Sequence, residues 1–395
     1  MISNLMQKKI SGGSAIRAMF EQGNKLAEQY GRENVYDFSL GNPNFPAPLS
    51  LQQSIHDEID NTDSLYLHGY MPNSGYPEVR QAIADNLNRR YSTHFSAENL
   101  IMTVGAAGAL NVVFKSILNP GDEIIVIPPY FLEYGNYVEN FGGQLVPVPA
   151  DEETFLPNPE HIRGAIGPKT KAVLLNNPNN PTGVVYGAET ISAIAAMLTE
   201  EAKRLGHPIL IVSDEPYREL CYDGESAPFI PTLYANTVVC YSWSKSLSLP
   251  GERIGYVLIP SECEESSELI SACTTANRIL GFVNAPSLLQ RAIVRCQDDW
   301  TDAVNFYDGN RRLLYDGLTS LGFECVYPKG AFYLWMKTPC DEKEFIQQAL
   351  GRRVLLVAGS SFGAPGYVRI AYCVSPDTIR RSLPSFRELA ELYIH

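Results

Sequence analysis

The sequence predicts an α/β fold joined to a smaller α+β unit. From about Asn99 onward, short apolar runs rich in Val and Ile alternate with helical stretches, which is typical of a sheet with crossover helices. Past Pro286 the pattern changes to long charged helices and then strands. We therefore expect an N-terminal arm and small-domain segment at 1–45, a large domain at 46–285 and a small C-terminal domain at 286–395.

The predicted arm holds one helical stretch, residues 14–30, followed by the segment YDFSLGNPNFPAP. Because its Gly, Asn and Pro residues force irregular backbone, we expect this segment to lie across the domain boundary or a partner subunit. The large domain should follow with helices at 106–118 and 190–205. The strands expected there are 100–104, 123–127, 172–176, 209–213, 237–241 and 254–259.

The small domain is predicted from residue 287 onward. Helices are expected across 287–321 and at 341–350, and the second of these should be flanked by strands at 331–336 and 367–371. Such a mixture, without regular alternation, is typical of an α+β unit.

Composition excludes several classes of partner. Lys and Arg total 31 against 44 Asp and Glu, a formal net charge of -13, which disfavours binding to nucleic acid or an anionic membrane. The start, MISNLMQKKI, lacks the apolar core of a signal peptide, so we expect a cytoplasmic protein with a small-molecule partner. Eight cysteines without C-x-x-C spacing indicate free thiols and no metal site.

Two reactive side chains follow apolar strands. Lys245, in YSWSKS, should emerge at the carboxyl end of a strand, where α/β sheets bind ligands. Its amine could form a Schiff base with an aldehyde cofactor if desolvation or a cation such as Arg253 lowers its pKa. Asp214 ends another apolar run, where a protonated pyridine nitrogen would offset its desolvation, and Tyr217 could hydrogen-bond the phenolate oxygen of the same ring.

Two loops add polar groups. The run NNPNNPTG at 176–183 follows a strand, and its turn formers hold the Asn180 amide in a rigid loop. Gly105, Ala106 and Ala107 lie between a strand and a helix, where free backbone N–H groups can receive a phosphate.

A lysine after a serine-rich strand end, N-P-T-G, a D-x-x-Y pair and a late arginine together resemble the aspartate-aminotransferase family of class I/II pyridoxal-phosphate (PLP) enzymes, fold type I. The resemblance covers nearly the whole chain in the family's order. It implies a large domain with a mainly parallel seven-stranded sheet, and PLP as cofactor. It also implies a ping-pong transfer of the α-amino group of an L-amino acid, with aspartate or an aromatic amino acid as candidate donor, to a 2-oxo acid.

The resemblance also implies a role for each matching residue. Lys245 would be the Schiff-base lysine, Asp214 the partner of the pyridinium nitrogen, and Tyr217 and Asn180 the partners of the ring oxygen. The remaining matches are Ser242, Arg253 and the backbone of Gly105, Ala106 and Ala107 for the phosphate, Phe131 for the ring face, Tyr70 for the phosphate of a neighbouring subunit in a homodimer, and Arg369 with Gly41 for the substrate α-carboxylate.

The sequence departs from the family in two places. Ala106 and Ala107 stand where many relatives carry hydroxyl or lysine side chains, so phosphate binding there would depend on backbone groups. No clear match exists for the arginine that binds a side-chain carboxylate in the best-known members, and Arg278 is the nearest candidate. Dicarboxylate specificity therefore stays open.

Three other functions compete with the transaminase. A β-eliminating C–S lyase on the same fold is the runner-up, because substrate-pocket side chains decide which Cα bond reacts. A PLP-binding regulator would need a DNA-binding segment for which the short N-terminus leaves no room. The G-x-S-x-G run at 359–363 would mark a serine hydrolase, but the only histidine downstream is the terminal His395.

Overall fold

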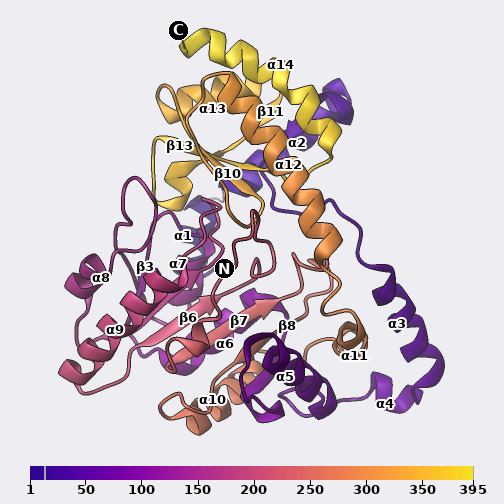
Figure 1. The fold of residues 1–395 in the computed structure, drawn as a ribbon, viewed down its shortest axis with the longest axis vertical. Helices are drawn as coiled ribbons and strands as arrows, with labels where there is room; N and C mark the ends of the chain where they lie inside the picture. The colour runs from indigo at the N-terminus through magenta and orange to yellow at the C-terminus, as the bar shows by residue number, and fades with distance from the viewer. Residues whose placement is uncertain (13–14, 395) are drawn as a thin grey trace.

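The computed structural model describes residues 1–12 and 15–394. Its centre is a seven-stranded sheet in the order β2-β8-β7-β6-β5-β3-β4, in which β8 runs antiparallel to both neighbours and every other adjacent pair is parallel (Figure 1). The prediction of a mainly parallel seven-stranded sheet is confirmed. The strands are β2 (Leu100–Thr103), β3 (Glu123–Val126), β4 (Gln144–Pro147), β5 (Thr170–Asn176), β6 (Leu210–Asp214), β7 (Thr237–Ser242) and β8 (Gly255–Leu258).

The six strands expected from the apolar runs are present, with ends shifted by one or two residues. Sequence reasoning missed β4. This strand pairs only with β3 at the edge of the sheet, its side chains are partly exposed, and it ends at Pro147. An edge strand lacks the continuous apolar run that marks the buried strands.

Helices cover both faces of this sheet because successive side chains of each strand point to opposite faces. One face packs against α6, α7 and α10. The other packs against α8 and α9 at β3, β5 and β6, and against α5 and α11 at β2, β8 and β7. The helices are α3 (Leu49–Asn61), α4 (Ser64–His68), α5 (Pro77–Tyr91), α6 (Gly105–Ile117), α7 (Glu133–Glu139), α8 (Pro159–Ala165), α9 (Ala188–Leu205), α10 (Ser266–Ile279) and α11 (Ser287–Ala292).

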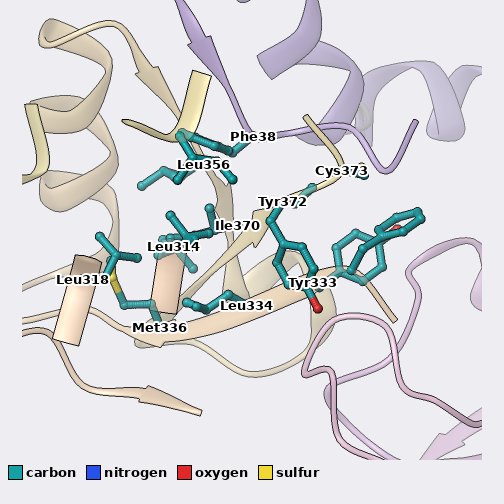
Figure 2. Packing of buried hydrophobic residues seen from close by; sticks show 14 of the residues in the cluster. Phe38, Leu314, Leu318, Tyr333, Leu334, Met336, Leu356, Ile370, Tyr372 and Cys373 are labelled. Atoms are coloured by element: carbon teal, nitrogen blue, oxygen red, sulfur yellow. The ribbon is translucent and has the colours of Figure 1, made fainter. Parts of the chain in front are cut away.

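A second core forms around a four-stranded antiparallel sheet in the order β12-β13-β10-β9, with β1 and β11 paired beside it. Figure 2 shows Phe38, which follows β1, beside Leu356 and Ile370 in this core. The strands are β1 (Tyr36–Asp37), β9 (Cys325–Val326), β10 (Tyr333–Lys337), β11 (Val354–Leu355), β12 (Val357–Ala358) and β13 (Tyr367–Ala371), and the helices α12 (Thr301–Ser320), α13 (Glu342–Gly351) and α14 (Pro376–Tyr393).

The helical region predicted at 287–321 divides into α11, a 3-10 turn at Ile293–Arg295 and α12. Residues 287–296 contribute to the core beside α5, whereas α12 packs against α14. Near the N-terminus lie α1 (Asn4–Gly12) and α2 (Ala15–Tyr30); α2 matches the predicted stretch 14–30, whose residue 14 lies outside the described residues. The domain limits at residues 45 and 285 stay a prediction.

Within the part of the chain that the structure describes, no helix is both long enough and apolar enough to cross a bilayer.

The second core gives a direct test of packing. Leu314 on α12 is fully buried, so Leu314→Ala should lower the free energy of unfolding by about 2–5 kcal/mol through the cavity it leaves. Leu392→Ala on α14 is the matched control, since Leu392 is 46% exposed and its loss should cost under about 0.5 kcal/mol. Urea unfolding followed by circular dichroism measures both, and equal midpoints would contradict this packing.

Candidate active site

A cavity of about 320 Å³ lies beyond the carboxyl ends of β5, β6 and β7, where the first turn of α6, α7 and the small sheet meet. It collects most of the residues predicted to form the site. Exposed Tyr70 and exposed Arg278 do not line it, and Gly105 lies behind it against Arg253. The predicted residues that line it are Gly41, Ala106, Ala107, Phe131, Asn180, Asp214, Tyr217, Ser242, Lys245, Arg253 and Arg369.

Lys245 follows β7, and its amine Nζ donates a hydrogen bond to the carbonyl oxygen of Gly41 at 2.7 Å. Burial, with a smaller contribution from the guanidinium groups of Arg369 and Arg253, lowers the pKa of Lys245 to about 8. Near that pH a large fraction of the amine is neutral and can attack a carbonyl carbon. The expectation of a reactive amine thus has a local physical cause.

Asp214 is the buried last residue of β6. Its Oδ2 accepts a hydrogen bond from the Tyr134 hydroxyl at 2.5 Å, whereas its Oδ1 has no hydrogen-bond partner among the described residues. Burial raises the pKa of Asp214 to about 7, and the Tyr134 hydrogen bond opposes that rise. An unpartnered buried carboxylate oxygen is costly unless it meets a cation, so this position fits a protonated ring nitrogen.

The loop after β5 is fixed by side-chain hydrogen bonds. The backbone N–H of Asn180 donates to Oδ1 of Asn176 at 2.7 Å, and the Asn180 side-chain oxygen accepts from Arg369 at 3.1 Å. Opposite this loop, the Tyr217 hydroxyl lies 2.8 Å from the hydroxyl of Tyr333. Amide and phenol groups therefore line the same part of the cavity.

Arg369 on β13 is buried and held by neutral groups. Its Nη2 donates to the Ser39 carbonyl at 2.6 Å, and its guanidinium lies 4.6 Å from the ring centre of Tyr333 and 4.9 Å from that of Phe362. Its Nε has no hydrogen-bond partner, and no carboxylate pairs with it among the described residues. A guanidinium held by neutral groups is available to bind a carboxylate ligand.

The start of α6 offers a site for an anion. Gly105 has φ +78°, and no side chain caps the helix, so the N–H groups of its first turn are available. A Cβ on Gly105 would lie 2.7 Å from Nη2 of Arg253, so a side chain at this position would push the guanidinium away. Ser242, the last residue of β7, lines the cavity nearby.

Sequence reasoning missed two tyrosines of the cavity lining that hydrogen-bond predicted residues: Tyr134, which donates to Asp214, and Tyr333, whose hydroxyl pairs with that of Tyr217. Tyr134 lies three residues after Phe131, a spacing that places both on one side of a helical turn and could have suggested it. Nothing in the sequence near Tyr333 pointed to the cavity.

The G-x-S-x-G run at 359–363 does not form the nucleophile elbow that a serine hydrolase would need. Residues 359–362 form a 3-10 helix after β12 rather than a strand-to-α-helix turn, so Ser361, the central serine of the run, does not lie on such a turn. His395 lies outside the described residues.

The mainly parallel seven-stranded sheet, with a lysine, a carboxylate and an arginine converging beyond its strands, defines an enzyme of fold type I. The chain belongs to the class I and II aminotransferase family, whose model matches residues 33–386. The aspartate/prephenate aminotransferase of Thermus thermophilus is 35% identical over 356 residues, which cover 88% of this chain and 89% of that protein.

Solved structures agree. An amino transferase from Eubacterium rectale has 46% sequence identity and a TM-score of 0.96, with 100% of both chains covered. The aspartate aminotransferase of Thermus thermophilus with maleate has 31% identity and a TM-score of 0.87, covering 98% of this chain and 99% of that one. The chain is therefore a transferase of amino groups, and neither a C–S lyase nor a regulator is favoured.

The raised pKa of Asp214 predicts how stability depends on pH. Its ordinary value is 3.8 and its folded value is about 7, so the folded apoprotein binds this proton more tightly than the unfolded chain. Stability from this group is present below about pH 4 and is lost as the pH rises to 7. Asp214→Asn should therefore raise the melting temperature of the apoprotein at pH 8 more than at pH 5. An equal change at both pH values, by calorimetry, would contradict the raised pKa.

Proposed function

We propose that this protein binds PLP in the cavity and moves the α-amino group of an L-amino acid to a 2-oxo acid by a ping-pong mechanism. The observation that carries the proposal is that the Lys245 amine and the unpartnered Oδ1 of Asp214 line the same cavity. When bound, PLP supplies an electron sink for the carbon that loses a proton.

Each end of the cavity suits one part of that cofactor. Lys245 would hold its aldehyde, Asp214 would keep its ring nitrogen protonated, and Phe131 would pack against its ring. Its phosphate would bind the first turn of α6. The other contacts would come from Tyr217 and Asn180 to the ring oxygen, and from Ser242, Arg253, Gly105, Ala106 and Ala107 to the phosphate.

The protein's own groups would then do three things. Arg369 would bind the substrate α-carboxylate through its two-pronged guanidinium, and Gly41 would close over the same group. Lys245, once released, would take the proton from the substrate Cα as a general base. Asp214 would hold the compensating positive charge in place during that transfer.

Aspartate or an aromatic amino acid is the proposed donor. Aspartate and aspartate/prephenate aminotransferases are among the curated relatives. Arg369 is the lining guanidinium suited to an α-carboxylate, and exposed Arg278 is outside the cavity of its own chain.

We also propose a homodimer in which Tyr70 reaches the partner's phosphate site. In its own chain Tyr70 is 95% exposed, as a side chain reserved for a partner would be. A cytoplasmic location stays a prediction.

Replacing Lys245 tests the cofactor lysine. Lys245→Ala should remove the visible absorption band of covalently bound PLP and lower turnover by at least about a hundredfold, because a positioned base contributes on that order. Lys203→Ala, an exposed lysine on α9, is the matched control and should keep both. Absorption spectra with PLP, before and after addition of a panel of amino acids without oxo acid, provide the measurement. Full turnover in the alanine variant would refute the assignment.

Replacing Arg369 tests the carboxylate site. Arg369→Lys should raise the KM for the amino-acid donor by at least about tenfold, because a bidentate charged contact becomes a single one. Affinity for PLP should stay unchanged. Exposed Arg278→Lys is the control, and steady-state kinetics with aspartate and phenylalanine compare the two. An unchanged KM in the Arg369 variant, or an equal rise in the Arg278 variant, would reject the assignment.

A further inference from the structure

Tyr333 lines the cavity and contacts both Tyr217 and Arg369. It sits on β10 opposite Ala371 of β13, and Trp335, two residues on, sits opposite Arg369. Tyr333 and Arg369 are therefore diagonal neighbours on one face of the small sheet. The guanidinium carbon lies 4.6 Å from the centre of the Tyr333 ring. Backbone register thus fixes the ring against the arginine.

The hydroxyl of Tyr333 points to a second group. It lies 2.8 Å from the Tyr217 hydroxyl, and neither hydroxyl makes another hydrogen bond within the described part of the chain. Burial raises the pKa of Tyr333 to about 12 and holds that of Tyr217 well above its ordinary value. Both phenols therefore keep their hydrogen at neutral pH. One hydrogen lies between the two oxygens, and the other is left for a third acceptor.

The proposed role of Tyr217 decides which phenol donates. If Tyr217 gives its single hydrogen to the ring oxygen of PLP, its own oxygen must accept from Tyr333. Two hydrogen bonds donated in the same direction polarise each other, so Tyr333 makes Tyr217 a stronger donor.

The backbone of Gly41 limits where the Tyr333 hydroxyl can go. A Cβ at Gly41 would lie 2.0 Å from that oxygen, so the absence of a side chain is what admits the phenol. The Gly41 carbonyl also accepts the Lys245 hydrogen bond. Tyr333 therefore touches the segment that contacts the cofactor lysine.

We propose that Tyr333 is a positioning residue with two separable roles: its hydroxyl orients Tyr217 toward the cofactor ring oxygen, and its ring holds Arg369 for the substrate carboxylate. The inference rests on the proposed function, because both ligands are those of a PLP-dependent transaminase.

Two variants separate the roles. Tyr333→Phe keeps the ring and removes the hydroxyl. It should raise the pH midpoint of the visible absorption change of bound PLP by about 0.4 to 1 unit, the range of one net hydrogen bond, because a donor that stabilises the ring-oxygen anion is weakened. Its donor KM should stay within about twofold of wild type. Tyr333→Leu removes both groups and should also raise the donor KM about 2- to 30-fold, the value of the lost cation–π contact.

A matched control is Tyr372→Phe. This buried phenol donates to the Ala331 carbonyl at 3.2 Å and does not line the cavity, so both readouts should stay at wild-type values. Should the leucine variant not fold, Tyr333→Met, whose unbranched and flexible side chain adapts to irregular space, takes its place.

Each outcome decides a different claim. A midpoint in Tyr333→Phe equal to that in Tyr372→Phe would overturn the role of the hydroxyl. If Tyr333→Phe and Tyr333→Leu raise the donor KM equally, or if neither variant raises it, the role of the ring is overturned. If the wild-type protein shows no PLP absorption band that depends on Lys245, the proposed function itself is overturned. If the band is normal but Tyr333→Phe leaves its pH midpoint unchanged, only the role of the hydroxyl is overturned.

Discussion

The buried carboxylate of Asp214, whose Oδ1 has no hydrogen-bond partner within the described part of the chain, is the constraint on which the site depends. Desolvation makes such a group unfavourable in its charged form, and the chain supplies only partial relief through the Tyr134 hydroxyl at Oδ2. Asn176 fixes the strand end by donating to the Asp214 backbone oxygen at 2.9 Å. The charged carboxylate of Asp214 therefore needs a cation at one fixed position, and a protonated aromatic nitrogen placed there would stabilise it.

Parallel strand pairing brings the other groups to that point. Asn176 of β5 pairs in register with Asp214 of β6, and Asp214 pairs with Cys240 of β7, two residues before Ser242. Because neighbouring parallel strands end at the same edge, residues far apart in the sequence become side-by-side neighbours. The small sheet then approaches from the opposite side and adds Arg369 and Tyr333.

Site residues could be predicted from the sequence where a local pattern marks them, and could not where they depend on contacts between distant strands. Asp214, Lys245 and Asn180 each follow a recognisable apolar strand, so both their place and their grouping could be predicted. Tyr333 could not, because its contact with Arg369 depends on the register between β10 and β13, which no local pattern records. Strand β4 was not predicted either. It pairs on one side only, at the exposed edge of the sheet, and therefore lacks the continuous apolar run that marks the buried strands.

The segment after β1 carries a constraint on its length in addition to the one on the side chain at Gly41. Arg369 and Lys245 both bind it through main-chain oxygens, those of Ser39 and Gly41. The chain bends at Ser39, and only Leu40 lies between the two residues, so the number of residues sets the relative position of the two carbonyls. One residue inserted or deleted between these two carbonyls would turn one of them away, while a substitution of Ser39 would leave its carbonyl in place. This short stretch therefore works as a spacer whose number of residues sets the position of both carbonyls, while side-chain identity is restricted at Gly41, where a Cβ would meet the Tyr333 hydroxyl.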